Sequence, residues 1–476
     1  AGARRCRRTT SRLTRGLDDD VITLRRSLRA TALVTGLALV VAACASGSPT
    51  VAPDGEPTTT AAGTTTTVTV PDDQLIDDLG RVAFAQGDLI DTEAVSRLAA
   101  TGDQRAAWLL ADVLRFVRSQ SSQGMILVEA LRDLTGVPIT PELPASWVVV
   151  MNDLITRDVP PPPDYASLKS TVFADLNPFF EAFFDDPDNA QDPRFVTWGG
   201  VQPDLRPLGD EAPCAGCIPA LDYPRVTSAE QARWLADERL VFGVVVDGEA
   251  RAYPRNQMEV HEMVNDSLGG REIAIPYCTL CGAAQAFYAD DVEGVERIVL
   301  RTSGLLHASN KVSYDLTTGT FFDTFSGVGV SGELAGLRLT QIPVVTSTWG
   351  EWKAEHPDTT VVGQDGGIGR TYEDFPLQGR DANGPIFPVG PIDDRLGSVE
   401  RVVTAITPDG TPVAFPVAAA GEAMDAGESV EVAGVRLVRS GSGFLVETTD
   451  GDPVLAHEAY WFAWSQRQPG TELWLP

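Results

Sequence analysis

Residues 241–282, VFGVVVDGEARAYPRNQMEVHEMVNDSLGGREIAIPYCTLCG, carry the clearest structural pattern in the chain. Two apolar runs flank Asp247-Gly248, a pair that supplies the positive φ angles of a tight primed turn, so this segment predicts a β-hairpin. A helix is expected from about residue 256 to 268, where a glycine pair ends it. The alternation of residues 272–277 then predicts a strand. The stretch thus predicts a strand–turn–strand–helix–strand unit.

The same unit returns 162 positions later. The matching pairs are Asp247 with Asp409, Gly248 with Gly410, Ala252 with Ala414, Tyr253 with Phe415, and Pro254 with Pro416. Self-similarity at a fixed offset indicates an internal duplication. At this offset His261, Cys278 and Cys281 fall on three residues without comparable chemistry, namely Ala423, Ser440 and Gly443. The first copy would then carry the chemistry, and the second would support it.

N-terminal to this region the pattern is helical. Apolar residues recur at helical spacing within 103–117, behind an aspartate that suits an N-cap, and residues 73–185 contain neither His nor Cys. We interpret residues 73–185 as a helical packing or interaction domain. The predicted fold class is α+β, with this helical domain followed by a β-rich mixed domain. That second domain would hold two pseudo-repeats, a first half over 195–390 and a degenerate half over 391–476.

The four cysteines beyond Cys44 form two Cys-x-x-Cys pairs, Cys214 with Cys217 and Cys278 with Cys281. Outside the cytoplasm such pairs form structural disulfides, within or between the pairs. Two such turns can also hold a metal as thiolates, although the 60-residue gap is longer than in compact zinc sites. Redox catalysis is the third alternative. The sequence leaves all three open.

His261 is the histidine that we place closest to this chemistry. The predicted helix that carries it directly precedes the strand that ends at Cys278, and a short glycine connection should pack the helix against the sheet. Thiolate and imidazole suit Cu(I) and Zn. Cys278, Cys281 and His261 are therefore the candidate metal ligands, with copper or zinc as the candidate cofactor.

The N-terminus has the features of an exported lipoprotein. Nine arginines precede an apolar run, residues 30–43, which is too short to span a membrane and ends at Cys44 in a lipobox-like Val-Ala-Ala-Cys. We expect residues 1–44 to be a signal peptide, of which 1–20 lie before an alternative start. Cys44 would carry lipid and anchor the protein on the extracytoplasmic face of the cell membrane. Residues 45–72, rich in Thr, Pro and Gly, predict a disordered tether.

The charge of the chain excludes one class of partner. Removing residues 1–44 takes away nine arginines and three aspartates, which leaves 28 basic and 63 acidic side chains and a net charge of −35. Nucleic acids and anionic lipid surfaces repel such a protein, so nucleic acid is not expected as a partner. The anchor at Cys44 would supply the contact with the membrane.

Several short motifs between Arg194 and Pro388 resemble the bacterial family called domain of unknown function 3179. The motifs are Trp198-Gly199-Gly200-Val201, Gly248 to Pro254, His261 to Asp266, Tyr277 to Gly282, Ser303 to Leu306, Ser309 to Lys311, Tyr314-Asp315, Trp349 with Trp352, His356 to Thr359, and Arg370-Thr371-Tyr372. The resemblance brings no activity with it. It indicates residues that support the site: Arg251, Tyr253, Glu262, Asn265, Asp266, Asn310, Tyr314 and Asp315. His307 stands where members usually have Tyr, and Cys214 and Cys217 are outside the pattern.

Two classes of function follow. The first is an extracytoplasmic metal-binding or thiol-redox protein that uses Cys278, Cys281 and His261. The second is a non-catalytic envelope lipoprotein that binds a glycan or a partner protein, with its cysteines paired for stability. A hydrolase is less well supported, because the chain has no Gly-x-Ser-x-Gly, His-Glu-x-x-His or Walker motif. Whether the protein is an enzyme stays open at this point.

Overall fold

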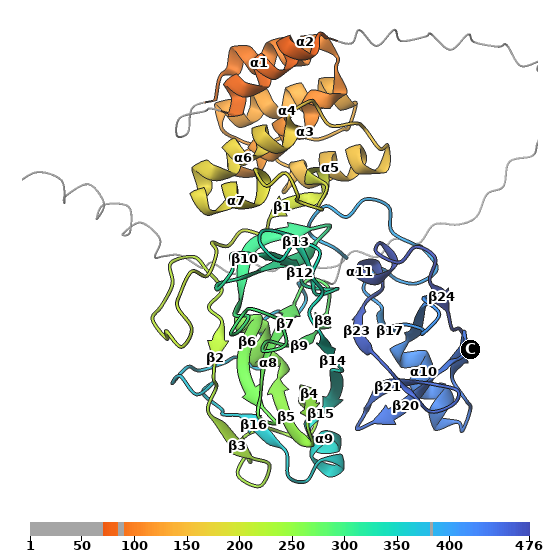
Figure 1. The fold of residues 1–476 in the computed structure, drawn as a ribbon. Helices are drawn as coiled ribbons and strands as arrows, with labels where there is room; N and C mark the ends of the chain where they lie inside the picture. Colours follow the sequence, from red (N-terminus) through yellow and green to blue (C-terminus); the bar gives the residue numbers. More distant parts are fainter. Residues whose placement is uncertain (1–69, 84–89, 381–383) are drawn as a thin grey trace, which may run out of the picture. The chain divides into compact units, whose positions relative to one another are not determined.

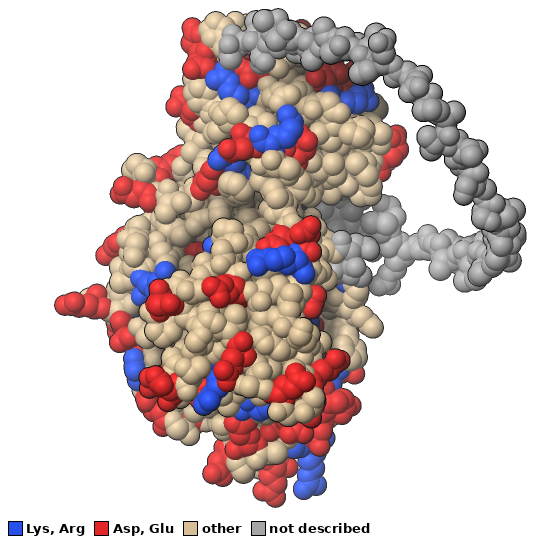
Figure 2. Space-filling model, turned by 90° about the vertical axis from the view of Figure 1, so that its right-hand side faces the viewer, with Lys and Arg blue, Asp and Glu red and all other residues tan. Residues whose placement is uncertain are grey.

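The computed structural model describes residues 70–83, 90–380 and 384–476. The predicted signal peptide, Cys44 and nearly all of the tether lie outside these residues. Within the described part of the chain, no helix combines the length and the apolar character needed to cross a membrane. Figure 2 shows acidic side chains spread over one face of the molecule with fewer basic ones among them, in keeping with the net charge.

The described chain begins with helices, in the region predicted to be helical (Figure 1). They are α1 (Asp72–Ala83), α2 (Thr92–Thr101), α3 (Ala107–Phe116), α4 (Ser122–Thr135), α5 (Ser146–Thr156), α6 (Tyr165–Leu176) and α7 (Glu181–Phe184). Helix α2 begins at an N-cap, Asp91, whose carboxylate accepts from two backbone N–H groups, and it ends at Gly102 with φ +68°. The local capping signals of the sequence therefore act as expected.

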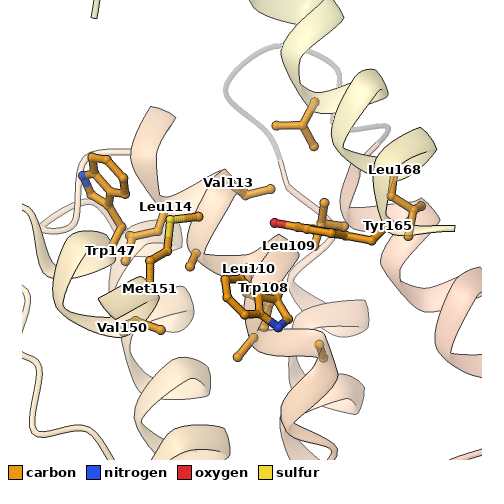
Figure 3. Packing of buried hydrophobic residues seen from close by; sticks show 14 of the residues in the cluster. Trp108, Leu109, Leu110, Val113, Leu114, Trp147, Val150, Met151, Tyr165 and Leu168 are labelled. Atoms are coloured by element: carbon orange, nitrogen blue, oxygen red, sulfur yellow. The ribbon is translucent and has the colours of Figure 1, made fainter. Parts of the chain in front are cut away.

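Helix α3 is the centre of the helical core. Figure 3 shows its Trp108, Leu110 and Leu114 clustered with Met151 of α5 and Tyr165 of α6. Trp108 is fully buried, and its indole N–H donates to the Val159 carbonyl at 3.1 Å, so its one polar group is satisfied. The packing explains why helix α3 tolerates apolar residues around most of its circumference.

The helical core continues into the β-rich region. Phe179 packs on Tyr314 with ring centroids 4.8 Å apart, and Phe183 packs on Phe321 at 5.1 Å. Val196 and Leu305 belong to the same buried cluster as the helices. The helical region thus shares one hydrophobic core with the first sheet.

The described strands form five small sheets (Figure 1). The first, in spatial order, is β1 (Val196–Trp198), β10 (Leu300–His307), β11 (Asn310–Asp315), β12 (Phe321–Asp323) and β13 (Val328–Ser331). The second is β14 (Gln341–Ile342), β9 (Ala286–Tyr288), β7 (Arg271–Cys278), β6 (Met263–Leu268) and β2 (Leu221–Asp222), with β8 (Ala283–Ala284) also paired to β7.

The other three sheets contain the hairpins of both copies of the repeat. The third sheet is β15 (Val345–Thr348), β4 (Leu240–Val246), β5 (Glu249–Pro254), β16 (Thr360–Val362) and β3 (Val226–Ser228). The fourth is β23 (Ala456–Tyr460), β17 (Arg401–Ile406), β18 (Pro412–Pro416) and β24 (Glu472–Leu473). The fifth is β19 (Glu431–Val432), β20 (Val435–Ser440), β21 (Gly443–Thr448) and β22 (Pro453–Val454).

The predicted fold class was wrong in its architecture. We expected an α+β protein with one β-rich mixed domain, but the five sheets adopt a five-bladed β-propeller-like arrangement after the N-terminal helical region. Alternation along the chain locates strands, but it does not determine which strands pair. The decisive pairings join distant segments, such as Leu221 beside Val264 and Val196 opposite His307.

The predicted pseudo-repeats fit the structure. Hairpin β4–β5 leads into α8 (Arg255–His261), and hairpin β17–β18 leads into α10 (Val417–Asp425). In both copies an antiparallel strand pairs with the first strand of the hairpin: β15 in the first copy and β23 in the second. A helix that begins with a buried Trp comes directly after that strand. A short strand, β16 or β24, then pairs in parallel with the second strand of the hairpin. Those two helices are α9 (Trp349–Glu355) and α11 (Trp461–Ser465).

One turn of each copy packs against a strand end of the other copy. The turn after β7 packs on the end of β23, where the Tyr460 N–H donates to the Cys281 carbonyl at 2.7 Å. The turn after β20 packs on the end of β15, where the Thr348 N–H donates to Ser442 Oγ at 2.7 Å. Each copy therefore covers part of the other.

The helix predicted over 256–268 was wrong in its second half. Helix α8 ends at His261 because Glu262 takes a left-handed conformation with φ +54°. The next residues form strand β6, which pairs antiparallel with β7 through a tight turn at the glycine pair. His261 is therefore the last residue of the helix, and Asn265 lies in strand β6.

Candidate functional site

Strand β7 delivers Cys278 directly into the Cys-x-x-Cys turn, as the sequence predicted. The Cys281 N–H donates to the Cys278 carbonyl at 3.1 Å, and Gly282 takes φ +62° beside the Tyr460 ring, where a larger residue has no room. The two cysteines are disulfide-bonded and are 1% and 0% exposed. The pair is therefore fully enclosed by protein.

The tip of the β10–β11 hairpin covers the two sulfurs. Ala308 and Ser309 form its turn with φ angles of +47° and +64°, which non-glycine residues adopt at a cost. This turn places the Ser309 carbonyl 3.6 Å from Cys281 Sγ and 4.0 Å from Cys278 Sγ. Asn310 Oδ1 lies 3.2 Å from Cys281 Sγ. The sulfurs thus face two carbonyl oxygens.

A largely buried ion pair between Lys311 and Glu262 links the β10–β11 hairpin to the cysteine turn. Lys311 Nζ lies 2.6 Å from Glu262 Oε2 and also donates to the Glu262 carbonyl at 3.1 Å. Thr279, between the two cysteines, donates to Glu262 Oε1 at 2.7 Å and accepts from Arg380 at 3.0 Å. Burial lowers the pKa of Lys311 from its ordinary value. Glu262 and Asn310 are the two predicted supporting residues that meet the cysteine turn.

His261 lies in a different environment from the two cysteines. Its Nδ1 contacts the Pro219 carbonyl at 2.7 Å and its Nε2 contacts the Tyr372 hydroxyl at 2.7 Å. Burial lowers the pKa of His261 to about 4, so the ring is neutral at pH 7. In the described part of the chain, Cys278, Cys281 and His261 are not brought together as one group of ligand atoms.

The remaining predicted supporting residues tie strands together. Asp266 accepts from Arg251 at 2.7 Å and from the Tyr253 hydroxyl at 2.8 Å, which links β6 to β5. Asn265 donates to Asp222 at 2.9 Å and to the Leu300 carbonyl at 3.1 Å.

Two more of them act in the first sheet. The Tyr314 hydroxyl donates to the Asp204 carbonyl, and Asp315 accepts from the Val299 N–H at 2.6 Å. These motif residues therefore position strands and do not converge on the cysteines.

The second cysteine pair forms a potential ligand group with Asp204, a residue that the sequence did not indicate. Cys214 and Cys217 are disulfide-bonded and partly exposed, and together with the buried Asp204 they place three ligand-type atoms within 4.8 Å of one another. Arg206 already binds the Asp204 carboxylate at 2.7 Å. A cation at this position would have to compete with that arginine and would need the disulfide reduced.

A cleft of about 1310 Å³ opens beside the cysteine turn. Tyr277 and Thr279 form part of its wall, next to Tyr460 from the second copy. Its aromatic and arginine side chains are Trp234, Tyr277, Tyr372, Phe375 and Tyr460 with Arg239, Arg255, Arg370 and Arg380, and its acidic ones are Glu238, Glu259, Asp365 and Asp374. The cleft is thus rich in aromatic rings and in charges of both signs.

Some residues next to the cysteine turn could not be predicted from the sequence. The buried Asp323 pairs with the partly exposed Arg467 at 2.6 Å, and Asp323 also accepts from the Asn310 amide at 3.4 Å. The two residues lie 144 positions apart, so no local pattern connects them. Tyr372 and Lys311 did appear among the family motifs, but neither had been assigned to the site.

Together the repeats, the motifs and the enclosed cysteine turn define a β-propeller-like protein with a large cleft that is lined by aromatic and charged side chains. The sequence profile described as protein of unknown function (DUF3179) matches residues 215–471, so the chain belongs to this family. The match begins after the Trp198–Val201 motif and continues beyond Pro388, where it includes the second copy of the repeat. Comparisons with curated proteins and with solved structures gave no match.

Proposed function

We propose that the protein is a cell-envelope lipoprotein, anchored through Cys44 on the extracytoplasmic face, that binds a glycan in the cleft. Its cysteines are paired within each Cys-x-x-Cys segment. The observation that carries the proposal is the cleft of about 1310 Å³, because its wall includes the motif residues Tyr277, Thr279 and Tyr372.

The side chains of the cleft suit a sugar. Aromatic rings present flat apolar faces, on which the C–H faces of a pyranose can pack, and Tyr hydroxyls donate and accept hydrogen bonds. Arginine and carboxylate groups make the directed, charge-assisted hydrogen bonds that sugar hydroxyls and acidic sugars can use. The volume exceeds that of most pockets for small molecules, which run from about 300 to 1,000 Å³, and so leaves room for several sugar units.

The surroundings of the cysteines favour this function over a metal centre. Both sulfurs of Cys278 and Cys281 are buried within a disulfide, and both ring nitrogens of His261 already have partners. A soft cation requires free thiolates and a free imidazole nitrogen. The copper or zinc site expected at these three residues would therefore need a rearrangement, whereas the cleft needs none.

The test is a titration of the full chain with two probes, a hexamer of galacturonic acid and the neutral maltohexaose, followed by tryptophan fluorescence and calorimetry. We expect saturable binding of at least one probe. Arg370→Ala and Phe375→Ala remove exposed cleft side chains and should weaken binding at least tenfold. Arg118→Ala, an exposed arginine outside the cleft, should leave binding unchanged.

Two results would refute the proposal. One is the absence of saturable binding of both probes up to millimolar concentrations. The other is binding that both cleft variants leave unchanged. A preference for the acidic hexamer would assign the arginines to carboxylate recognition, and a preference for maltohexaose would assign the rings to stacking.

A further inference from the structure

We infer that Cys278 and Cys281 are a reversible redox pair and that the folded protein accommodates their dithiol form better than their disulfide. Glycan binding does not require this chemistry, so the inference stands apart from the proposed function. It rests on the groups that surround the two sulfurs, and His261 has no part in it.

Two buried carbonyl oxygens face the sulfurs without a proper donor. Asn310 Oδ1 is 3.2 Å from Cys281 Sγ, and the Ser309 carbonyl is within 4.0 Å of both sulfurs. Among the residues that the structure describes, neither oxygen accepts from an N–H or O–H group. A disulfide carries no proton, whereas each thiol can donate one. In the disulfide form both oxygens are therefore buried without a donor, which is unfavourable.

The orientation of the Asn310 amide is fixed from its other end. Its Nδ2 donates to Asp323 Oδ2 at 3.4 Å, and Arg467 holds the same carboxylate at 2.6 Å. A flipped amide would turn its carbonyl oxygen toward the carboxylate, and two acceptors would then face each other. The amide oxygen consequently has to point at Cys281.

The neighbouring pair provides an internal reference. Cys214 and Cys217 have the same spacing and are also disulfide-bonded, but they are partly exposed. Within the described residues their sulfurs make no hydrogen-bond contact with a carbonyl oxygen of the kind seen at Cys281. Their disulfide therefore loses nothing by lacking a proton.

The reduction step balances with an extracytoplasmic dithiol as the electron donor. The S–S bond between Cys278 and Cys281 breaks, two electrons and two protons are taken up, and the donor becomes a disulfide. The new thiols donate to Asn310 Oδ1 and to the Ser309 carbonyl. Because the sulfurs are enclosed, exchange waits for a local opening of the turn and is slow, although the equilibrium favours the dithiol.

The experiment measures the equilibrium of both pairs in one sample. The full chain is incubated in buffers of reduced and oxidised dithiothreitol, approached from the oxidised and from the reduced side, then alkylated, and the thiols of each pair are counted by peptide mass spectrometry. We expect an equilibrium constant for reduction of Cys278–Cys281 about tenfold above that of Cys214–Cys217, which is about 30 mV for a two-electron couple.

Variants locate the cause of the difference. Asn310→Ala removes one acceptor and should lower the constant for Cys278–Cys281 about fivefold without changing that for Cys214–Cys217. Ser326→Ala removes a hydroxyl that donates to the far oxygen of Asp323 at 2.9 Å, and it should change neither constant. If Asn310→Ala fails to fold, the comparison of the two pairs in the wild-type chain decides.

The inference is overturned if Cys278–Cys281 is as hard to reduce as Cys214–Cys217, or harder. It is also overturned if a folded Asn310→Ala variant keeps the wild-type constant. Failure of glycan binding leaves both measurements unaffected, so the two proposals fail separately.

Discussion

Replacing Lys311 by methionine removes the cation from the ion pair beside the cysteine turn. The ammonium and the Glu262 carboxylate are 2.6 Å apart, and their side chains are 5% and 12% exposed. Breaking a buried pair from one side costs about 3–5 kcal/mol, because the remaining charge loses its partner. Thr279 still donates to Glu262, and some water reaches the carboxylate. We therefore expect a loss of about 3 kcal/mol in the free energy of unfolding.

The reverse substitution should cost less. Glu262→Gln leaves Lys311 without its anion, but burial already lowers the pKa of Lys311, so this side chain can release its proton and become neutral. We expect a loss of about 1–2 kcal/mol, and less in the double variant than the two single losses combined.

Urea denaturation at pH 7, followed by tryptophan fluorescence, measures both variants and the coupling between them. Thiol counts of the folded variants serve as a control that the cysteine turn is intact. A Lys311→Met variant within about 0.5 kcal/mol of the wild type would contradict the reasoning, because surface substitutions have effects of that size. Equal losses for the two single variants would contradict the argument from the pKa of Lys311.

Three further predictions concern the anchor, the turn and the response to acid. Cys44→Ser should move the protein from the detergent phase to the aqueous phase in a partition assay, and retention in detergent would contradict the lipobox. Gly282→Ala places a Cβ 2.9 Å from the Tyr460 ring, so it should cost more stability than Gly270→Ala, where the left-handed backbone has open space around it. Burial lowers the pKa of His457 to about 4, so this residue should contribute about 1.4 kcal/mol per pH unit to the loss of stability as the pH drops from 6.5 toward 4, and urea midpoints should show a shallower fall in His457→Phe.

Features set by neighbouring residues were predictable from the sequence. The hairpin at Asp247-Gly248, the strand that ends at Cys278 and the duplication at an offset of 162 depend on local turns and alternation. Residues 263–268 show the limit of this reasoning. Their apolar positions fit a helix as well as a strand, and the left-handed Glu262 that decides between the two has no sequence signature.

Features set by distant residues were not predictable. The propeller-like arrangement depends on pairings such as β1 with β10, and a single sequence offers no information about partners more than a hundred residues apart. The same holds for the site: Asn310 reaches Cys281 across 29 positions, and Lys311 reaches Glu262 across 49. The motifs identified these residues and their chemistry, but they did not predict which residues each one contacts.

The contact between the two copies has a consequence for the order in which the cysteine turn is completed during folding. The Cys281 carbonyl accepts from the Tyr460 N–H, and Tyr460 belongs to the last strand but one of the described chain. Because a chain is synthesised from its N-terminus, we expect the cysteine turn to lack this contact until β23 has been made and has docked. We therefore expect oxidants and reductants to reach the two sulfurs more readily in a chain that is still folding than in the folded protein, where the sulfurs are enclosed and exchange waits for a local opening.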